Sequence, residues 1–201
     1  MSPVRPLILA SASKSRANVL RAAGLTFEVE PADTDEDAVK AALKAEGASA
    51  ARCAEALAEA KALVVSRRHH HALVIGADQM LDCEGRWFDK PADLAGARAH
   101  LMSLRGRTHV LPTAVAVAFN GASVWHHVAL PRLTMRTFSE DFVDAYLQAA
   151  GAAVLSSVGA YQLEGLGAQL FSRIEGDFFT ILGLPLLELL GFLRDQQAIA
   201  Q

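Results

Sequence analysis

Residues 73–91 read LVIGADQMLDCEGRWFDKP, and this stretch predicts how the rest of the chain is arranged. Its first three residues, Leu73-Val74-Ile75, are bulky and apolar, which is typical of a short buried strand. We expect Gly76-Ala77 to let the backbone pass closely out of the end of that strand. Asp78 then falls at the carboxyl edge of the strand, where open α/β sheets place ligands and catalytic groups.

A tight turn at Glu84-Gly85 is expected to bring the chain back towards Lys90-Pro91. The resulting hairpin would allow an acid, Asp78, and a base, Lys90, to face one small site. The alternative is an aspartate that caps a turn and a lysine that lies in solvent. This stretch alone leaves both interpretations open.

Size and composition exclude several classes of protein. The chain has 201 residues, of which 52% are hydrophobic and 20% charged, so it is globular rather than disordered and long enough for one domain spanning residues 1–201. A formal net charge of −3 does not favour a nucleic-acid polymer as partner. Cys53 and Cys83 do not make a disulfide framework. Because no secretory signal or membrane-spanning stretch is evident, we expect a soluble, cytoplasmic protein.

The N-terminal residues combine a predicted strand at 7–10 with a loop, SASKSR, at 11–16 and a helix beyond it. Backbone N–H groups at the start of such a helix, together with Ser hydroxyls and the charges of Lys14 and Arg16, would make a seat for a phosphate. The loop lacks the glycines of a P-loop. Simple capping of the helix by a serine is the alternative.

Two further segments carry charges that could serve a site. The acidic run DTDED at 33–37 could hold a divalent cation, or it could be a solvated helix start. Ser49 is expected to cap a helix to about Val64, with a buried stripe through Cys53, Leu57, Ala60 and Val64. Lys61 would lie at the edge of that stripe, from which it could either extend into solvent or reach a site at the helix end.

The second half of the chain predicts a mixture of strands and helices. Residues 109–119 suggest one long strand, followed by a hairpin turn at Asn120-Gly121. Residues 133–138 suggest an edge strand, and residues 174–183 a further strand before a closing helix that starts at Pro185. The alternation of strands and helices indicates an α/β fold.

Taken together, several segments resemble the Maf family of nucleoside-triphosphate pyrophosphatases, in the order found in that family and over essentially the whole chain. The matching segments are LASASKSR at 9–16, Asp35-Glu36, AEAKA at 58–62, IGADQ at 75–79, DKP at 89–91, LRGRTHVLPTAVAV at 104–117, GAYQLEG at 159–165 and IEGDFFTILGLPL at 174–186.

The resemblance implies a mixed, twisted α/β sheet flanked by helices, with two lobes and a cleft, related in architecture to the inosine-triphosphate pyrophosphatases. It implies hydrolysis of the bond between the α- and β-phosphates of a nucleoside triphosphate, with Mg²⁺ or Mn²⁺ as cofactor, by a homodimer. The alternatives are a nucleotide-binding regulator of cell division with little turnover, and a phosphatase or phosphotransferase, which would form no pyrophosphate.

The resemblance also assigns roles to residues. Asp78 matches the family's catalytic aspartate, and its carboxylate could either act on the attacking water or hold the metal; Glu36 matches an acidic position in the same site. The expected triphosphate-binding residues are Ser11, Ser13, Arg16, Lys61 and Lys90.

Three positions are expected to select the base: Ser15, Gln79 and Glu164. Gln79 and Glu164 resemble the branch of the family that acts on 7-methyl-GTP rather than the branch that acts on dTTP and UTP. A carboxylate at Glu164 can accept hydrogen bonds from the N1–H and the exocyclic amine of guanine. Ser15 offers no aromatic surface for stacking, so selectivity is expected to be looser than in the 7-methyl-GTP branch.

Overall fold

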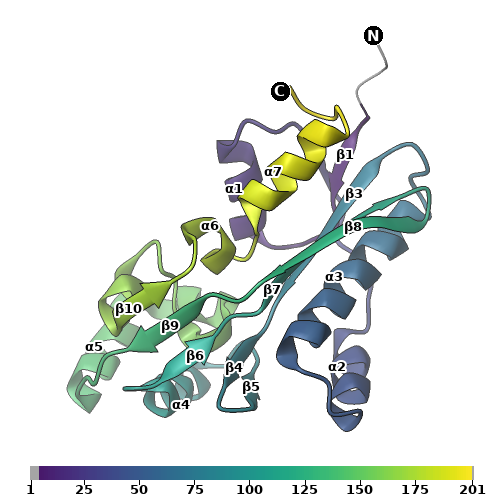
Figure 1. Cartoon of the computed structure of the whole chain (residues 1–201). Helices are drawn as coiled ribbons and strands as arrows, with labels where there is room; N and C mark the ends of the chain where they lie inside the picture. The colour runs from purple at the N-terminus through teal and green to yellow at the C-terminus, as the bar shows by residue number, and fades with distance from the viewer. Residues whose placement is uncertain (1–4, 201) are drawn as a thin grey trace. The chain divides into compact units, whose positions relative to one another are not determined.

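The computed structural model describes residues 5–200 and divides into two compact units, each with its own sheet (Figure 1). The first unit comprises Met1–Asp78, Thr113–Ala129 and Phe178–Gln201, and the second comprises Gln79–Pro112 and Leu130–Asp177. Helices and strands alternate along the chain, which confirms the α/β class predicted from the sequence. Within residues 5–200, no helix has the length and apolar character needed to cross a membrane.

The sheet of the first unit has the order β2-β1-β3-β7-β8 and is mixed. Its strands are β1 (Leu7–Leu9), β2 (Glu28–Val29), β3 (Leu73–Gln79), β7 (Thr113–Phe119) and β8 (Ala122–Ala129). Strand β1 runs parallel to both β2 and β3, whereas β7 and β8 are antiparallel and are joined by the predicted turn at Asn120-Gly121.

Helices cover both faces of this sheet, because successive side chains of a strand point to opposite faces. The helices of the unit are α1 (Lys14–Ala22), α2 (Glu36–Ala45), α3 (Ala50–Ser66), α6 (Phe178–Ile181) and α7 (Leu186–Asp195). Leu9 and Ile75 pack in one buried cluster with residues of α1 and α7, and Ile8 and Val74 pack in another with Val65 of α3.

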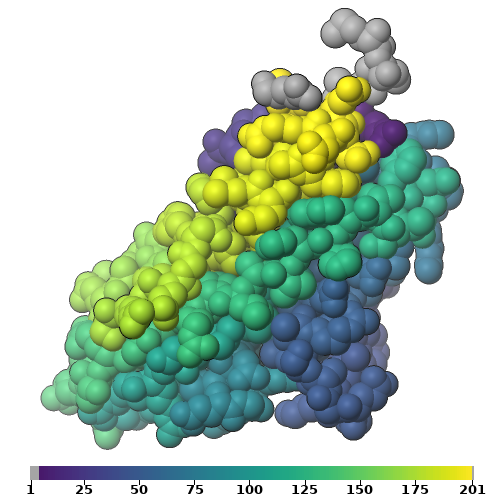
Figure 2. Space-filling view, viewed as in Figure 1, coloured from purple at the N-terminus to yellow at the C-terminus, as the bar shows by residue number. Residues whose placement is uncertain are grey.

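Helix α7 lies beside β8 on the face shown in Figure 2, where it is coloured yellow. Trp125 of β8 and Phe192 of α7 stack with their ring centroids 5.0 Å apart. The predicted closing helix after Pro185 therefore covers the sheet as an amphipathic helix should.

Strand β3 is longer than the sequence suggested, and this corrects the interpretation of Gly76. The strand continues through Gly76 to Gln79, so Asp78 lies inside it rather than after its end. A Cβ atom on Gly76 would meet the backbone oxygen of Ala58 and the backbone nitrogen of Ala62 in α3. The glycine is therefore required for close packing of helix against strand, not for an exit of the chain.

The second unit is built on a sheet of order β10-β9-β6-β4-β5, in which every recorded pairing is antiparallel. Its strands are β4 (Leu81–Cys83), β5 (Arg86–Phe88), β6 (Thr108–Val110), β9 (Arg132–Met135) and β10 (Phe171–Glu175). Its α-helices are α4 (Leu94–Leu104) and α5 (Glu140–Ala150). Three short 3-10 helices follow α5: η1 (Gly151–Ser156), η2 (Val158–Ala160) and η3 (Leu166–Leu170). The Glu84-Gly85 turn joins β4 to β5 as predicted, with φ of 56° and 83° at its two residues.

Three strand predictions in this part of the chain were wrong. The long strand at 109–119 is divided at Pro112 into β6 and β7, which belong to different sheets. A proline has no N–H to donate to a continuous ladder, which is consistent with the break. Strand β9 lies between β10 and β6 and is not an edge strand. Residues 174–183 are the end of β10 followed by α6.

Candidate functional site

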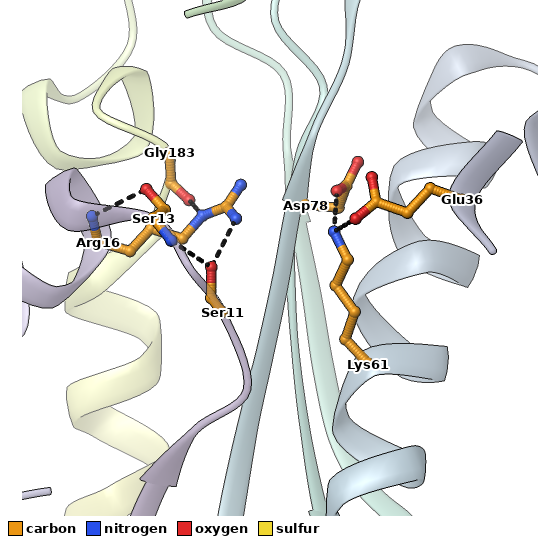
Figure 3. A network of polar contacts seen from close by, with 7 residues as sticks. All are labelled: Ser11, Ser13, Arg16, Glu36, Lys61, Asp78 and Gly183. Carbon is orange, nitrogen blue, oxygen red and sulfur yellow. Dashed lines mark hydrogen bonds and ion pairs between the residues drawn. The ribbon is translucent and has the colours of Figure 1, made fainter. Parts of the chain in front are cut away.

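Polar side chains gather where β1 and β3 end, in the first unit (Figure 3). Leu9 of β1 is paired in register with Ile75 of β3, so the loop that follows β1 begins beside Ala77 and Asp78. The carboxyl ends of neighbouring parallel strands are where α/β sheets place ligands. The structure therefore brings together two segments that lie more than sixty residues apart in the sequence.

The loop at 11–16 is held by its own hydroxyl groups. The Ser13 hydroxyl accepts a hydrogen bond from the Arg16 backbone N–H at 3.4 Å and caps α1. The buried Ser11 hydroxyl accepts from the Ser13 backbone N–H and from the Arg16 Nη1, each at 3.2 Å. Arg16 is therefore directed over the loop rather than into solvent. The serine cap is confirmed, and the phosphate seat stays a prediction.

Lys61 connects two carboxylates across the other side of the site. Its Nζ donates to Asp78 Oδ1 at 2.6 Å and lies 2.8 Å from Glu36 Oε1. The side chains of Lys61 and Asp78 are only 9% and 8% exposed, whereas Glu36 is 42% exposed. One ammonium faces two carboxylates, so the group carries a net negative charge.

The position of Lys61 corrects the helical stripe drawn from the sequence. Lys61 lies within the buried face of α3, with Leu57, Ala58 and Val65, whereas Ala60 and Val64 are only half-buried. The predicted stripe followed the apolar residues Ala60 and Val64 and left Lys61 at its edge. Asp78 on the facing strand provides Lys61 with a buried partner, which allows a lysine on the buried face of α3.

Electrostatic coupling links Arg16 to the carboxylates. Burial lowers the pKa of the Arg16 guanidinium, while the charges of Asp78 and Glu36 oppose that effect. Charges of opposite sign therefore face one site, which suits a ligand that carries several phosphate oxygens and a counter-ion.

The residues at this site fit a divalent metal ion. Asp78 Oδ2 is buried and has no hydrogen-bond partner within the part of the chain that the structure describes. Buried carboxylate oxygens rarely remain unpaired, so this atom is suited to a ligand. Within residues 5–200 no group of three or more His, Cys, Asp or Glu side chains could hold a metal ion on its own. Magnesium is commonly bound by one or two carboxylates together with substrate phosphates, which is what Asp78 and Glu36 would offer.

A cavity of about 370 Å³ lies against the loop and the outer side of α1. Its size is within the range of small-molecule pockets. It is lined by Ser11, Ala12, Ser13, Lys14, Ala17, Asn18, Arg21 and Val29. Ser11 and Ser13 therefore face open space, although neither Asp78 nor Lys61 contributes to this lining.

The sequence of the chain matches a known protein family. The family model described as "Maf-like protein" matches residues 6–196, which is nearly the whole chain.

The chain belongs to the Maf family.

Its relatives cover almost its full length. A protein of Paramagnetospirillum magneticum named "Nucleoside triphosphate pyrophosphatase" is 61% identical over 94% of this chain and 97% of its own length. One of Granulibacter bethesdensis with the same name is 58% identical over 96% of this chain and 98% of its own. A protein of Rhizobium meliloti named "7-methyl-GTP pyrophosphatase" is 52% identical over 96% of this chain and 97% of its own length.

The structure places the remaining expected Maf site residues in two groups. Ser15 belongs to the first unit, and its hydroxyl donates to the backbone oxygen of Leu182 at 3.0 Å. Gln79, Lys90 and Glu164 belong to the second unit, where Lys90 and Glu164 are exposed and Gln79 is half-buried. Their participation in the same site stays a prediction.

Sequence reasoning missed one part of the Maf site, the backbone of residues 182–183. The Gly183 carbonyl accepts from Arg16 Nε at 2.8 Å, beside the Leu182 carbonyl that accepts from Ser15. Every residue has a backbone carbonyl, so the sequence does not show which carbonyls accept hydrogen bonds from side chains. The one available signal was Gly183 itself, a glycine immediately after a helical segment and shortly before a proline.

Proposed function

We propose that this chain is a nucleoside triphosphate pyrophosphatase, which hydrolyses the bond between the α- and β-phosphates and releases a nucleoside monophosphate and pyrophosphate. The observation that carries the proposal is that the polar side chains of the loop after β1 lie beside the ion pair formed by α3 and β3, at one edge of the sheet. Ser11, Ser13 and Arg16 offer donors for phosphate oxygens, and Lys61 and Asp78 form a buried pair beside them. The names of the relatives support the same activity.

Each residue has a chemical role in this proposal. Arg16 and the loop hydroxyls would bind phosphate oxygens, because a guanidinium presents several N–H donors in a fixed plane. The unpaired Asp78 Oδ2 would accept the proton of a water molecule that attacks the α-phosphorus, or would hold the cation beside it. Lys61 would orient the Asp78 carboxylate and add positive charge near the phosphates.

The charge at the site supports a requirement for Mg²⁺ or Mn²⁺. Lys61 is shared between two carboxylates, so little net positive charge remains for a triphosphate. Asp78 and Glu36 are the residues that would hold the ion. When bound, it would neutralise phosphate charge and polarise the phosphoryl oxygens.

The test is pyrophosphate release from a panel of nucleoside triphosphates with Mg²⁺ or Mn²⁺, with Asp78→Asn as the matched control. Equal amounts of monophosphate and pyrophosphate from the wild type, and release from the variant that is slower by about 10²-fold or more, would support the proposal. Release of free phosphate would indicate a phosphatase or phosphotransferase. Tight binding without turnover would favour the nucleotide-binding regulator of cell division.

We further propose that the base preferred is a methylated or otherwise modified guanine. Glu164 is exposed and could accept the N–H groups of a guanine edge, and its charge suits a cationic methylated ring. Two relatives, each 52% identical, are named "7-methyl-GTP pyrophosphatase". The Ser15 hydroxyl is bound to a backbone carbonyl, which leaves Gln79 and Glu164 as the side chains that would read the base.

This preference is tested by kcat/KM for 7-methyl-GTP, GTP, dTTP and UTP. Glu164→Gln should lower the value for 7-methyl-GTP and leave that for dTTP nearly unchanged, because only the guanine edge needs two acceptors. A preference of the wild type for dTTP or UTP would overturn this part of the proposal and leave the pyrophosphatase activity in place.

A further inference from the structure

The short helix α6 ends in a turn that has a defined geometry. The Gly183 N–H donates to the Thr180 carbonyl at 2.9 Å, and the Leu184 N–H donates to the Phe179 carbonyl at 3.1 Å. These two bonds make a Schellman motif, in which the residue after the helix adopts a left-handed conformation. Gly183 has a φ of +101°, which L side chains rarely adopt. Leu184 is fully buried and anchors the turn.

Two consecutive carbonyls of this turn are bound by two consecutive side chains of α1. Leu182 O accepts from the Ser15 hydroxyl at 3.0 Å, and Gly183 O accepts from Arg16 Nε at 2.8 Å. Figure 3 shows the Gly183 carbonyl directed at Arg16 from the side away from Asp78. We call these two contacts, Ser15–Leu182 and Arg16–Gly183, the carbonyl clamp.

The clamp decides how Arg16 is presented. With Nε bound to Gly183 and Nη1 bound to Ser11, the guanidinium plane is held at two of its nitrogens. Nη2 makes no hydrogen bond to any residue that the structure describes, so that edge remains for a ligand. A long side chain held in this way has less conformational freedom to lose when it binds an anion.

We propose that residues 182–183 form a positioning element for Arg16, and that Ser15 serves this element rather than selecting the base. The proposal rests on the phosphate-binding role of Arg16 given above. Its physical basis is that a cation already held in its binding geometry binds a multivalent phosphate more tightly than a mobile one.

Gly183→Ala is the direct test, because the left-handed φ of +101° would be strained by a side chain, while the new Cβ atom would make only an ordinary contact, 3.4 Å from Arg16 Nε. We expect about tenfold weaker binding of inorganic tripolyphosphate, measured by calorimetry, and a matching rise in KM for nucleotides with a smaller change in kcat. Gly191→Ala is the matched control, since a Cβ atom on this glycine of α7 has nothing within 4 Å. It should leave tripolyphosphate binding unchanged.

Combination with Arg16→Ala separates positioning from a general structural effect. If the clamp acts through Arg16, Gly183→Ala should weaken tripolyphosphate binding in the wild type and have no further effect in the Arg16→Ala background. An equal loss in both backgrounds would overturn the proposal. Ser15→Ala, which leaves the backbone intact, should show the same dependence on Arg16 with a smaller loss, and it decides the question if Gly183→Ala does not fold.

Different results would reject the proposed enzyme activity and the proposed clamp. A wild type that binds tripolyphosphate but releases no pyrophosphate from any nucleotide would reject the enzyme and leave the clamp to be judged by binding alone. A wild type and an Arg16→Ala variant that bind tripolyphosphate equally would reject the clamp as a phosphate-positioning device, whatever the activity.

Discussion

The ion pair of Lys61 and Asp78 is buried, so substitution of either residue is expected to affect stability as well as activity. Removing one partner of such a pair leaves the other charge buried without compensation, which is costly. Here the cost depends on which partner is removed, because Lys61 retains Glu36 when Asp78 is changed, whereas Asp78 Oδ1 loses its ammonium when Lys61 is changed. Substitutions of the two residues are therefore expected to lower activity and stability in different proportions.

We expect Asp78→Asn to lower kcat by about 10²- to 10⁴-fold, the usual effect of losing a general base. The free energy of unfolding should fall by only about 1 kcal/mol, because an asparagine oxygen can still accept from Lys61. Lys61→Ala should lower the free energy of unfolding by more, about 3 kcal/mol, since it leaves a buried carboxylate without its charged partner. Urea unfolding of the two variants measures this difference. Wild-type turnover in Asp78→Asn would refute the catalytic assignment.

Glu36 is the more exposed of the two carboxylates on Lys61, so its loss should affect metal binding more than folding. Glu36→Gln should raise the Mg²⁺ or Mn²⁺ concentration for half-maximal activity and leave the thermal midpoint close to that of the wild type. Asp37→Asn, at the next residue of the same acidic run, is the control. An unchanged metal dependence in Glu36→Gln would mean that the run only favours the start of α2.

His109 should give the protein a pH-dependent stability. It is fully buried in the second unit, and its Nε2 lies 2.7 Å from the Tyr161 hydroxyl. Burial lowers the pKa of His109 from 6.5 to about 4. The unfolded chain therefore binds more protons than the folded chain between these pH values, so stability is complete above about pH 6.5 and is lost as the pH falls towards 4.

We expect this residue to lower the free energy of unfolding by about 2 kcal/mol between pH 7.5 and pH 5. His109→Gln should reduce the pH dependence by that amount, as measured by urea unfolding at the two pH values. Tyr161→Phe, which removes the hydrogen bond but leaves the histidine buried, should retain the dependence. If His109→Gln retained it as well, the titrating group would lie elsewhere.

At the scale of elements, the packing of α3 on β3 holds the ion pair of Lys61 and Asp78 together. Lys61 comes from the helix and Asp78 from the strand, and Gly76 allows the two backbones to approach. The close approach is what brings a lysine side chain within 2.6 Å of a carboxylate on a neighbouring element.

Gly76→Ala should therefore affect both folding and activity. Its Cβ would overlap the backbone of α3 at Ala58, and overpacking against a backbone costs about 3 kcal/mol. We expect a lower urea midpoint and a fall in kcat greater than the fall in nucleotide affinity, because Lys61 and Asp78 would separate. Gly191→Ala in α7 is the control with open space around the new Cβ. A fully active and stable Gly76→Ala variant would contradict the packing role.

At the scale of the whole molecule, the first unit contains Arg16, Lys61 and Asp78, and the second contains Lys90 and Glu164. The chain is expected to be a single Maf-like domain. The family match over residues 6–196 includes segments of both units.

We also expect a homodimer, as the Maf resemblance implies. Light scattering at micromolar concentration should give about twice the chain mass of 21.4 kDa. Dilution into the nanomolar range, followed by a second mass measurement, would show whether the assembly is permanent. A monomer throughout would reject the prediction without affecting the assignment of the site.

The sequence by itself determined the local structure and the family. A serine cap before α1, the cap at Ser49 and the turn at Glu84-Gly85 were predicted and are present. Such features depend on hydrogen bonds and backbone preferences within a few residues, so they can be read locally. The family was identified by eight segments in order along the chain, whereas the strand before Asp78 was predicted too short and continues to Gln79.

Only the tertiary structure decided what the site residues contact. The burial of Lys61 between two carboxylates, the need for a glycine at 76 and the binding of Ser15 and Arg16 by the backbone at 182–183 all depend on contacts between distant segments. A helical wheel or a motif assigns a face or a role from the residue's own polarity. The partner that makes a buried charge or a left-handed glycine favourable comes from another element, and the packing of the elements decides which partner that is.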